Sequence, residues 1–314
     1  MEMDIGPSAL GGWRITRQHR RELLNGRLMG TKMTHLVKSI LGSFCGAALM
    51  IATNNATAQA NRIYSFAVVP QYSATELHKE WAPVLQRITR DTGISLELRI
   101  AASIPKFEAE FLKGTPDFAY MNPYHAVMAK LAHGYVPILR DSQPLSGILL
   151  ARRDGAYQSI RDLNGQTIAF PAPNAFGASL YMRALLAEDA GIKIEPRYVK
   201  THSNVYRHVI RNDVAAGGSV NAAFNDEVPE VREQLRVIYQ TPEVASHPVV
   251  VHPRVPHAVT KAIAEAFLAL GKDEGGRVLL KEIRTPRPVA ANYERDYLPL
   301  EKLNIRKYLV TEKE

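Results

Sequence analysis

The sequence is poor in cysteine. Cys45 is the only cysteine among the 314 residues, and it lies within the first 60. A form of the chain that loses this segment has no thiol. Disulfides, thiolate metal ligands and a cysteine nucleophile are excluded for that form, and with them the small secreted proteins that depend on a disulfide framework.

A long apolar run is also missing from the start of the chain. The run at residues 40–52 has 13 residues, fewer than the ~20 that span a bilayer. Basic residues precede it, and A-x-A patterns follow at 56–58 and 58–60. This order predicts a secretory signal peptide with an upstream leader over residues 1–60, cut after one of the two patterns. An uncleaved N-terminal anchor is the alternative.

The excess of positive charge is small once that segment is removed. The formal net charge is +8 for the whole sequence, and it falls to +4 without residues 1–60, because seven Lys and Arg residues and three acidic ones lie there. A charge this small and scattered does not favour nucleic acid as a partner. It suits a receptor for small anions.

The remaining chain repeats one order of elements twice, about 100 residues apart. Each unit reads strand, helix, strand, helix, strand, and helices begin at capping residues such as Ser73 and Thr201. Pro83 predicts a kink or a restart within the first helix. The pattern predicts an α/β fold with parallel sheets, either as two lobes or as one larger doubly wound sheet. The predicted strands are 64–69, 95–100 and 117–120 in the first unit and 167–170, 196–200 and 213–216 in the second.

Two stretches are placed to carry the chain between two lobes. They are residues 135–152, in which 145–151 is strand-like, and residues 249–253, where 248–251 is strand-like; an apolar helix at 258–270 follows the second. Two crossover strands would then form a hinge on which the lobes close. The expected lobes are residues 61–148 with 250–314 and residues 149–249.

Candidate binding residues follow the third strand of the first unit. Ligands of open α/β sheets lie beyond the carboxyl ends of the strands, where helix N-termini favour anions. Asn122 followed by Pro123 predicts a capped helix start, and Tyr120, Tyr124 and His125 flank it. This segment would supply donors and aromatic faces to one wall of a cleft.

The matching segment of the second unit is predicted to be an anion seat. Asn174 would cap the helix, and Gly177 would let a ligand approach backbone N–H groups. Three histidines at rim positions, His125, His202 and His247, could bind an oxyanion or together hold zinc or copper. No H-x₃-H or H-E-x-x-H spacing supports a metal, so neither a metal nor a cofactor is expected.

Several short segments, taken in order, carry a resemblance to a known family. They are Phe66 to Pro70, Trp81-x-Pro83, Asp117 to Tyr124, Ser159 to Gly165 leading into Thr167 to Phe170, Pro173-Asn174, His202 and His247-Pro248. Together they resemble the PhnD-like phosphonate, phosphite and phosphate substrate-binding proteins of ABC importers, from about residue 63 to 300. The resemblance implies a two-lobed type II periplasmic binding protein fold that closes on a small oxyanion. It further implies a periplasmic protein that delivers this ligand to a membrane permease and its ATPase.

The resemblance also implies which residues touch the ligand. They are Tyr72, Tyr120 to Tyr124, Asn174 with Ala175, Phe176 and Gly177, and His202; His125 and His247 are added from their rim positions.

The second-unit segment departs from the family. Phosphonate binders usually have a Ser-Thr-Ser run where this chain has Ala175, Phe176 and Gly177, and aminoalkylphosphonate binders carry an acid where it has His247. An amino-phosphonate is therefore not expected. A less charged or more apolar ligand, with Phe176 as a wall, stays open.

The predicted function is that of a monomeric binding protein without catalysis. Several rival functions stay open. No G-x-S-x-G elbow, P-loop or G-x-G-x-x-G fingerprint is present, so an exported enzyme would rest on the fold alone. The other rivals are a periplasmic sensor that feeds a histidine kinase and a histidine-based metal carrier.

Overall fold

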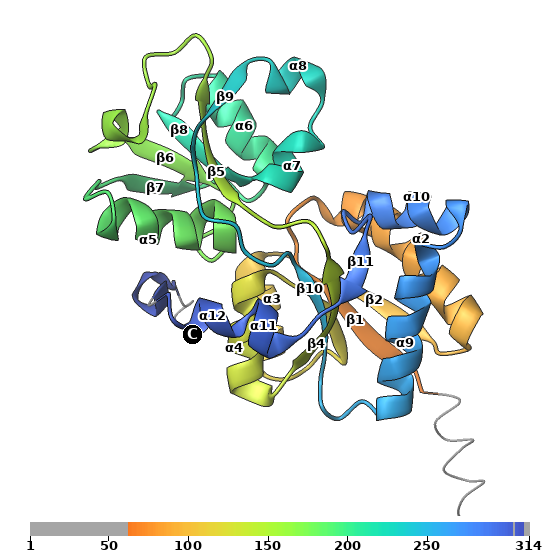
Figure 1. Ribbon diagram of the computed structural model, residues 1–314. Helices are drawn as coiled ribbons and strands as arrows, with labels where there is room; N and C mark the ends of the chain where they lie inside the picture. Colours follow the sequence, from red (N-terminus) through yellow and green to blue (C-terminus); the bar gives the residue numbers. More distant parts are fainter. Residues whose placement is uncertain (1–61, 304, 311–314) are drawn as a thin grey trace, which may run out of the picture. The chain divides into compact units, whose positions relative to one another are not determined.

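The computed structural model describes residues 62–303 and 305–310 (Figure 1). The predicted signal peptide and leader, residues 1–60, lie outside the described residues. Within the described ranges, no helix has both the length and the apolar character needed to cross a bilayer.

The strands form two separate sheets. In spatial order, the first sheet contains β11 (Pro288–Ala290), β4 (Val136–Asp141), β10 (Pro248–Val251), β3 (Phe118–Tyr120), β1 (Tyr64–Val68) and β2 (Leu96–Ile100). The second contains β7 (Glu195–Tyr198), β6 (Thr167–Phe170), β8 (Ala216–Val220), β5 (Gly147–Arg152) and β9 (Leu235–Gln240). β1 pairs in parallel with β2 and β3, and β6 pairs in parallel with β7 and β8. The predicted β-α-β-α-β repeat is confirmed, and the alternative of one larger sheet is wrong.

Helices cover both faces of each sheet (Figure 1). In the first unit, α2, α9 and α10 pack together, and α3, α4 and α12 pack together. Their bounds are α2 Ala74–Thr92, α3 Ile104–Leu112, α4 Pro123–His133, α9 His257–Leu270, α10 Glu274–Glu282, α11 Tyr293–Asp296, α12 Leu298–Glu301 and the 3₁₀ turn η3 Ile305–Tyr308. Those around the second sheet are η1 Ile160–Leu163, the π-helical turn η2 Phe176–Leu180, α5 Tyr181–Glu188, α6 His202–Ile210, α7 Asn221–Asn225 and α8 Pro229–Arg232.

Helix α2 shows how the local sequence fixes an element. The Ser73 hydroxyl accepts a hydrogen bond from the backbone N–H of Glu76 at 3.2 Å, and the helix ends at Gly93, whose φ is 71°. Gly tolerates this left-handed conformation without a steric penalty. The predicted restart at Pro83 does not occur, because the helix runs without interruption through this exposed position. An exposed proline leaves the freed carbonyl open to water.

Strand β8 lies later in the chain than predicted. The expected strand at 213–216 is in fact Ala216–Val220, and Gly217 and Gly218 occupy its centre. A Cβ on Gly217 would lie 2.4 Å from the Val205 side chain, and one on Gly218 would lie 2.1 Å from the Ala178 carbonyl oxygen. Close packing of α6 and η2 therefore requires glycine here. A Gly-Gly pair lacks the apolar alternation that marks a strand, which explains the error.

The chain passes twice between the sheets. It leaves the first sheet after β4 and returns to it at β10, through residues 142–146 and 241–247. Leu145 and Val244 pair across these two segments, with N–H···O distances of 2.8 and 3.0 Å. Two crossings are thus present and run side by side. The first lies within the predicted stretch 135–152, whereas the second comes before the predicted stretch 249–253, which begins inside β10 of the first sheet. The bounds of the lobes themselves stay a prediction.

Candidate functional site

The loops after four parallel strands enclose a pocket of about 460 Å³. Because the carboxyl ends of parallel strands meet at one edge of a sheet, this is where a ligand of such a fold is expected. We call it the loop pocket. Its lining comes from residues 70–74 after β1, 101–106 after β2, 171–173 after β6 and 198–201 at the end of β7.

A second, smaller pocket of about 70 Å³ lies against the crossing segments, and we call it the inner pocket. Tyr72 lines both pockets, so they share one wall. The inner pocket thus brings together residues from both sheets and from the C-terminal part of the chain. Its lining includes Gln71, Tyr72, Tyr120, Val220, Asn221, His247 and Arg284.

The two tyrosines of the inner pocket keep their protons. Burial raises the pKa of Tyr120 to about 12 and raises that of Tyr72 further. The Tyr120 ring packs against Trp81, with 4.8 Å between the ring centroids, and stacks on the His247 ring at 5.6 Å. Both phenols are therefore fixed, neutral hydrogen-bond donors at ordinary pH.

His247 lies in the inner pocket as a neutral imidazole. Burial and the neighbouring His125 and His202 lower its pKa to about 3. Its Nε2 lies 2.8 Å from the amide Nε2 of Gln71, and an amide nitrogen can only donate. The His247 Nε2 is therefore the acceptor, and Nδ1 carries the proton.

His202 is buried at the start of α6. It is 2% exposed, and burial, followed by the Arg284 charge, lowers its pKa to about 4. Its Nδ1 lies 2.9 Å from the hydroxyl of Ser219, which in turn lies 2.7 Å from the Tyr206 hydroxyl. His125 and His247 are also less than 9% exposed, so all three histidines are buried beside the strand ends. Helices and loops pack over these strand ends. The spacing of the histidines along the chain does not reveal this burial.

Arg284 is the residue that sequence reasoning missed. Its guanidinium lies 3.9 Å from the centre of the Tyr72 ring and forms two hydrogen bonds with Glu80, at 2.8 and 3.0 Å. Its Nε lies 3.0 Å from a carboxylate oxygen of Asp226. Asp226 directly follows α7, in the part of the chain that forms the second sheet. Burial lowers its pKa, but the hydrogen bonds to Glu80, together with the effects of Tyr72 and of the Glu80 and Asp226 charges, outweigh this and raise it, so the charge is permanent. No motif marks this arginine, although its φ of 57° places it among strained positions.

Asn122 caps α4 as predicted, whereas Asn174 does not cap a helix. The Asn122 Oδ1 accepts a hydrogen bond from the His125 N–H at 2.8 Å. Ala175 precedes η2 without a side-chain cap. The Asn174 amide instead donates to Glu108 at 2.9 Å and to the Val310 carbonyl at 2.8 Å, and it accepts from the Val310 N–H at 3.0 Å. The C-terminal segment reaches Asn174 only in the folded chain, so no local pattern could show this.

The predicted anion seat is occupied by packed side chains. Phe176 is 2% exposed and stacks between Tyr124 and Tyr181, with centroid distances of 6.1 and 5.4 Å. Gly177 packs so closely on Gly147 that a Cβ on the latter would lie 2.0 Å from its carbonyl oxygen. Residues 174–177 and Tyr124 line neither the loop pocket nor the inner pocket. Tyr72, Tyr120 and His247 do line the inner pocket, and His202 packs against Tyr72 at a centroid distance of 6.1 Å.

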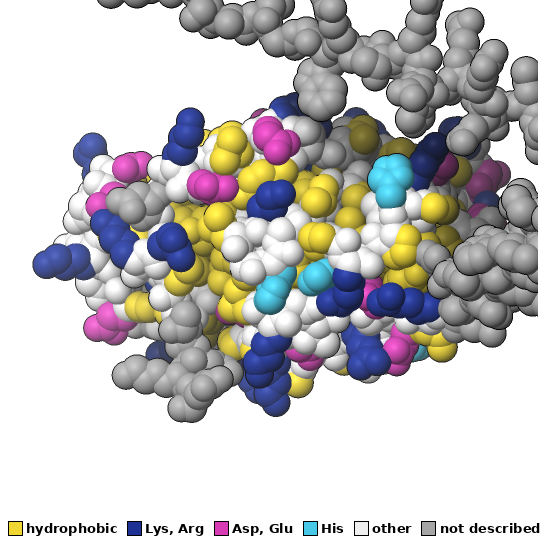
Figure 2. Space-filling model, turned by 90° about the horizontal axis from the view of Figure 1, so that it is seen from below, with side chains coloured by type: hydrophobic (Ala, Val, Ile, Leu, Met, Phe, Trp, Pro, Cys, Tyr) yellow, Lys and Arg dark blue, Asp and Glu magenta, His cyan; other side chains and the backbone are white. Residues whose placement is uncertain are grey.

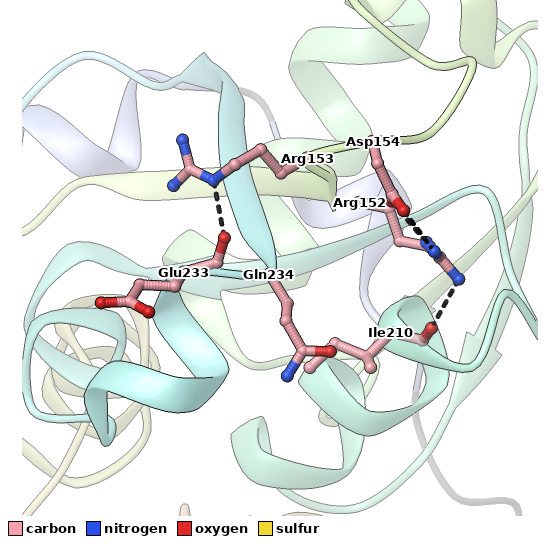
Figure 3. A pocket seen from close by; sticks show the side chains of 6 residues that line it. All are labelled: Arg152, Arg153, Asp154, Ile210, Glu233 and Gln234. Atoms are coloured by element: carbon pink, nitrogen blue, oxygen red, sulfur yellow. Dashed lines mark hydrogen bonds and ion pairs between the residues drawn. The ribbon is translucent and has the colours of Figure 1, made fainter.

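A further pocket of about 310 Å³ lies at the far end of β5 (Figure 3). Since β5 runs antiparallel to β8, this end is opposite the edge that carries the loop pocket. The guanidinium of Arg152 binds Asp154 and the Ile210 carbonyl, and that of Arg153 binds the Glu233 carbonyl (Figure 3). Both charges are thus used in local structure.

The surface charge is mixed on the face that Figure 2 shows. Lys and Arg side chains lie there among acidic and apolar ones rather than in one continuous track. Within the described ranges, no group of three or more His, Cys, Asp or Glu is placed to hold a metal ion.

Solved structures with the same fold include known binding proteins. PhnD1 of Prochlorococcus marinus in complex with methylphosphonate has a TM-score of 0.72 at 13% identity, covering 79% of this chain and 99% of that one. A binding protein component of a phosphonate ABC transporter from Pseudomonas aeruginosa has a TM-score of 0.69 at 16% identity, covering 77% and 85%. XAC2383 from Xanthomonas citri, bound to chloride ion, has a TM-score of 0.65 at 17% identity, covering 79% and 99%. The two-sheet architecture is therefore the type II periplasmic binding protein fold.

Sequence comparison identifies the family. No curated protein sequence matches the chain. A family profile described as "ABC transporter, phosphonate, periplasmic substrate-binding protein" matches residues 66–297, well over half of the chain. The chain therefore belongs to the family of periplasmic substrate-binding proteins of phosphonate ABC transporters.

Proposed function

We propose that this protein binds a small phosphonate-type oxyanion in the inner pocket and delivers it to the permease and ATPase of an ABC importer. The observation that supports this most is the convergence of Tyr72, Tyr120, His247 and Arg284 on one pocket between the two sheets. The relative from Prochlorococcus marinus, whose fold this chain shares, holds methylphosphonate. Phosphite and phosphate present the same oxygens and are the other members of the ligand class.

The chemistry of the inner pocket suits an oxyanion through neutral donors. Two phenol hydroxyls and the Nδ1–H of His247 can each donate one hydrogen bond to a ligand oxygen. Hydrogen bonds to a charged partner are stronger than those between neutral groups. The fixed positive charge of Arg284 lies beside them, though Glu80 and Asp226 hold it in this arrangement.

Ligand entry requires the pocket to widen. About 70 Å³ is little more than room for water, so the loops around it must part before an oxyanion enters. The paired crossing segments, 142–146 and 241–247, are the places where the two sheets could turn relative to each other. Separation of Asp226 from Arg284 would also free one face of the guanidinium for the ligand.

We infer that the protein binds without catalysis and in the periplasm, as a monomer. A binding protein that serves an importer releases its ligand unchanged. Ligand recovered after denaturation of the complex should therefore be chemically identical to the ligand added, at one equivalent per chain. Turnover of a phosphonate or phosphate ester would instead favour an exported enzyme.

Titration calorimetry with methylphosphonate, phosphite, phosphate and sulfate tests the proposed site. Tyr120→Phe removes one hydroxyl from the pocket and should weaken binding of the preferred oxyanion roughly 10- to 150-fold, the value of a hydrogen bond to a charged group. Tyr64→Phe is the matched control, because the Tyr64 hydroxyl is buried without a hydrogen-bond partner among the described residues. Equal binding by both variants would place the ligand elsewhere. Delivery is tested separately: deletion of the gene should abolish uptake of the same compound, whereas a sensor would leave uptake intact.

A further inference from the structure

The loop pocket differs from the inner pocket in its chemistry. Its walls are largely apolar, with Pro70, Ala101, Ile104 and Ala172 from both sheets' loops and the half-exposed ring of Tyr198. An inorganic oxyanion gains nothing from such walls. Each Å² of apolar ligand surface buried against these walls contributes about 25 cal/mol to the free energy of binding.

The individual loops that line the loop pocket are stiff. Prolines at 70, 105, 171 and 173 restrict the backbone of the loops that line it. Lys200 has a φ of 79°, and its N–H donates to the Pro171 carbonyl at 2.8 Å, which joins two of these loops. Loops that keep their own shape lose less conformational entropy when a ligand binds between them.

The charge around the loop pocket favours an anion over a neutral apolar molecule. Lys106 and Lys200 belong to its lining, and α2, α3 and α6 all begin there, behind the capping residues Ser73, Ser103 and Thr201. Helix N-termini and ammonium groups both attract negative charge. An apolar group attached to an anionic one therefore matches this surface.

We propose that the loop pocket receives the organic substituent of the bound phosphonate, and that this substituent is apolar and about the size of an aromatic ring. The proposal rests on the proposed function, since the phosphonate group itself would lie in the inner pocket. Tyr72 lines both pockets, and the proposed ligand would extend from one to the other beside this residue. The volume of about 460 Å³ falls in the range of ~300–1,000 Å³ that is usual for organic ligands. The substrate class is thus arylphosphonates and similarly bulky organophosphonates, in preference to phosphate or methylphosphonate.

Calorimetry with phenylphosphonate and methylphosphonate on the purified protein tests this. Phenylphosphonate should bind at least about tenfold more tightly, a difference of ~1.4 kcal/mol. Ala102→Phe places a ring in the loop pocket from an exposed position, so folding should be unaffected. It should abolish the preference and leave methylphosphonate binding within about twofold of the wild type. Ala187→Phe, at an exposed position on α5 outside both pockets, is the matched control and should preserve the preference.

The outcomes separate the two proposals. If both compounds bind equally well to the wild type, or if Ala102→Phe keeps the full preference, the substituent does not lie in the loop pocket, while oxyanion binding itself stands. If neither compound binds, this inference fails, and the proposed function fails as well if phosphite and phosphate also do not bind.

Discussion

Two groups of polar residues connect the two sheets, and they differ in how tightly they are buried. The Asn174 cluster consists of Glu108, Asn122, His125 and Asn174, and each member is 6% exposed or less. The Arg284 cluster consists of Arg284, Glu80 and Asp226 beside Tyr72, and the Asp226 side chain is 51% exposed. The first is a buried network of hydrogen bonds, in which the His125 Nδ1 lacks a partner among the described residues, whereas the second borders both water and a pocket.

The difference indicates which contact between the sheets can change during function. In the Asn174 cluster, Glu108 receives hydrogen bonds from two partners, His125 at 2.8 Å and Asn174 at 2.9 Å. Breaking these contacts leaves buried polar atoms without partners, which costs free energy. In the Arg284 cluster, water or a ligand oxygen can replace the exposed carboxylate of Asp226. We therefore assign stability to the first cluster and ligand exchange to the second.

Removal of the Glu108 carboxylate should give the largest effect. Glu108→Ala leaves His125 and Asn174 without their shared partner and should lower the free energy of unfolding by about 3–5 kcal/mol, the usual cost of breaking a buried pair. Asp226→Asn should lower it by less than about 1 kcal/mol, as for an exposed ion pair. Denaturant unfolding of both variants is the measurement. Equal losses would mean that the two clusters do not differ as we describe.

Acid should destabilise the protein through the buried histidines beside the Arg284 cluster. The pKa of His202 falls from 6.5 to about 4 on folding, so below pH 6.5 the unfolded chain takes up a proton that the folded chain does not. The free energy of unfolding should therefore decrease by ~1.4 kcal/mol per pH unit for this residue as the pH falls from 6.5 to about 4. His247 adds a similar decrease that extends to about pH 3.

Unfolding measured as a function of pH checks this assignment. His202→Gln should show a shallower slope below pH 6.5 than the wild type. His257→Gln, which changes an exposed histidine at the start of α9, should keep the wild-type slope. The same slope in all three proteins would remove His202 as the cause.

The smallest predicted effect concerns ligand affinity. Asp226→Asn removes the carboxylate that competes with a bound anion for Arg284 and should tighten oxyanion binding about fivefold, equivalent to an exposed ion pair of up to ~1 kcal/mol. Titration calorimetry measures this. Weaker binding in the variant would show that Asp226 helps to form the bound state rather than competing with it.

Local sequence predicted the elements well where each has its own start and stop signals. Strand β6 occurs at 167–170 as predicted, and Ser73, Ser103, Thr201 and Asn122 cap the helices that follow them. β8 was predicted too early in the chain. Its two central glycines are required by close packing against α6 and η2, and local propensity does not favour a strand there. Which residues contact the ligand stays a prediction, but the packing of Asn174 and Phe176 differs from expectation for a similar reason.

The amino-acid sequence by itself determined the α/β repeat, the two crossings between sheets and the family to which the chain belongs. The repeat and the crossings follow from hydrophobic periodicity and from helix caps, which act over a few residues, and the family follows from the resemblance of several short segments and from the profile match. Only the tertiary structure decided that Asn174 binds the C-terminal segment, that Phe176 fills the expected anion seat, and that Arg284 comes to lie on Tyr72. These contacts join residues that are more than 50 positions apart, and side-chain packing between distant elements leaves no periodic signal in the sequence.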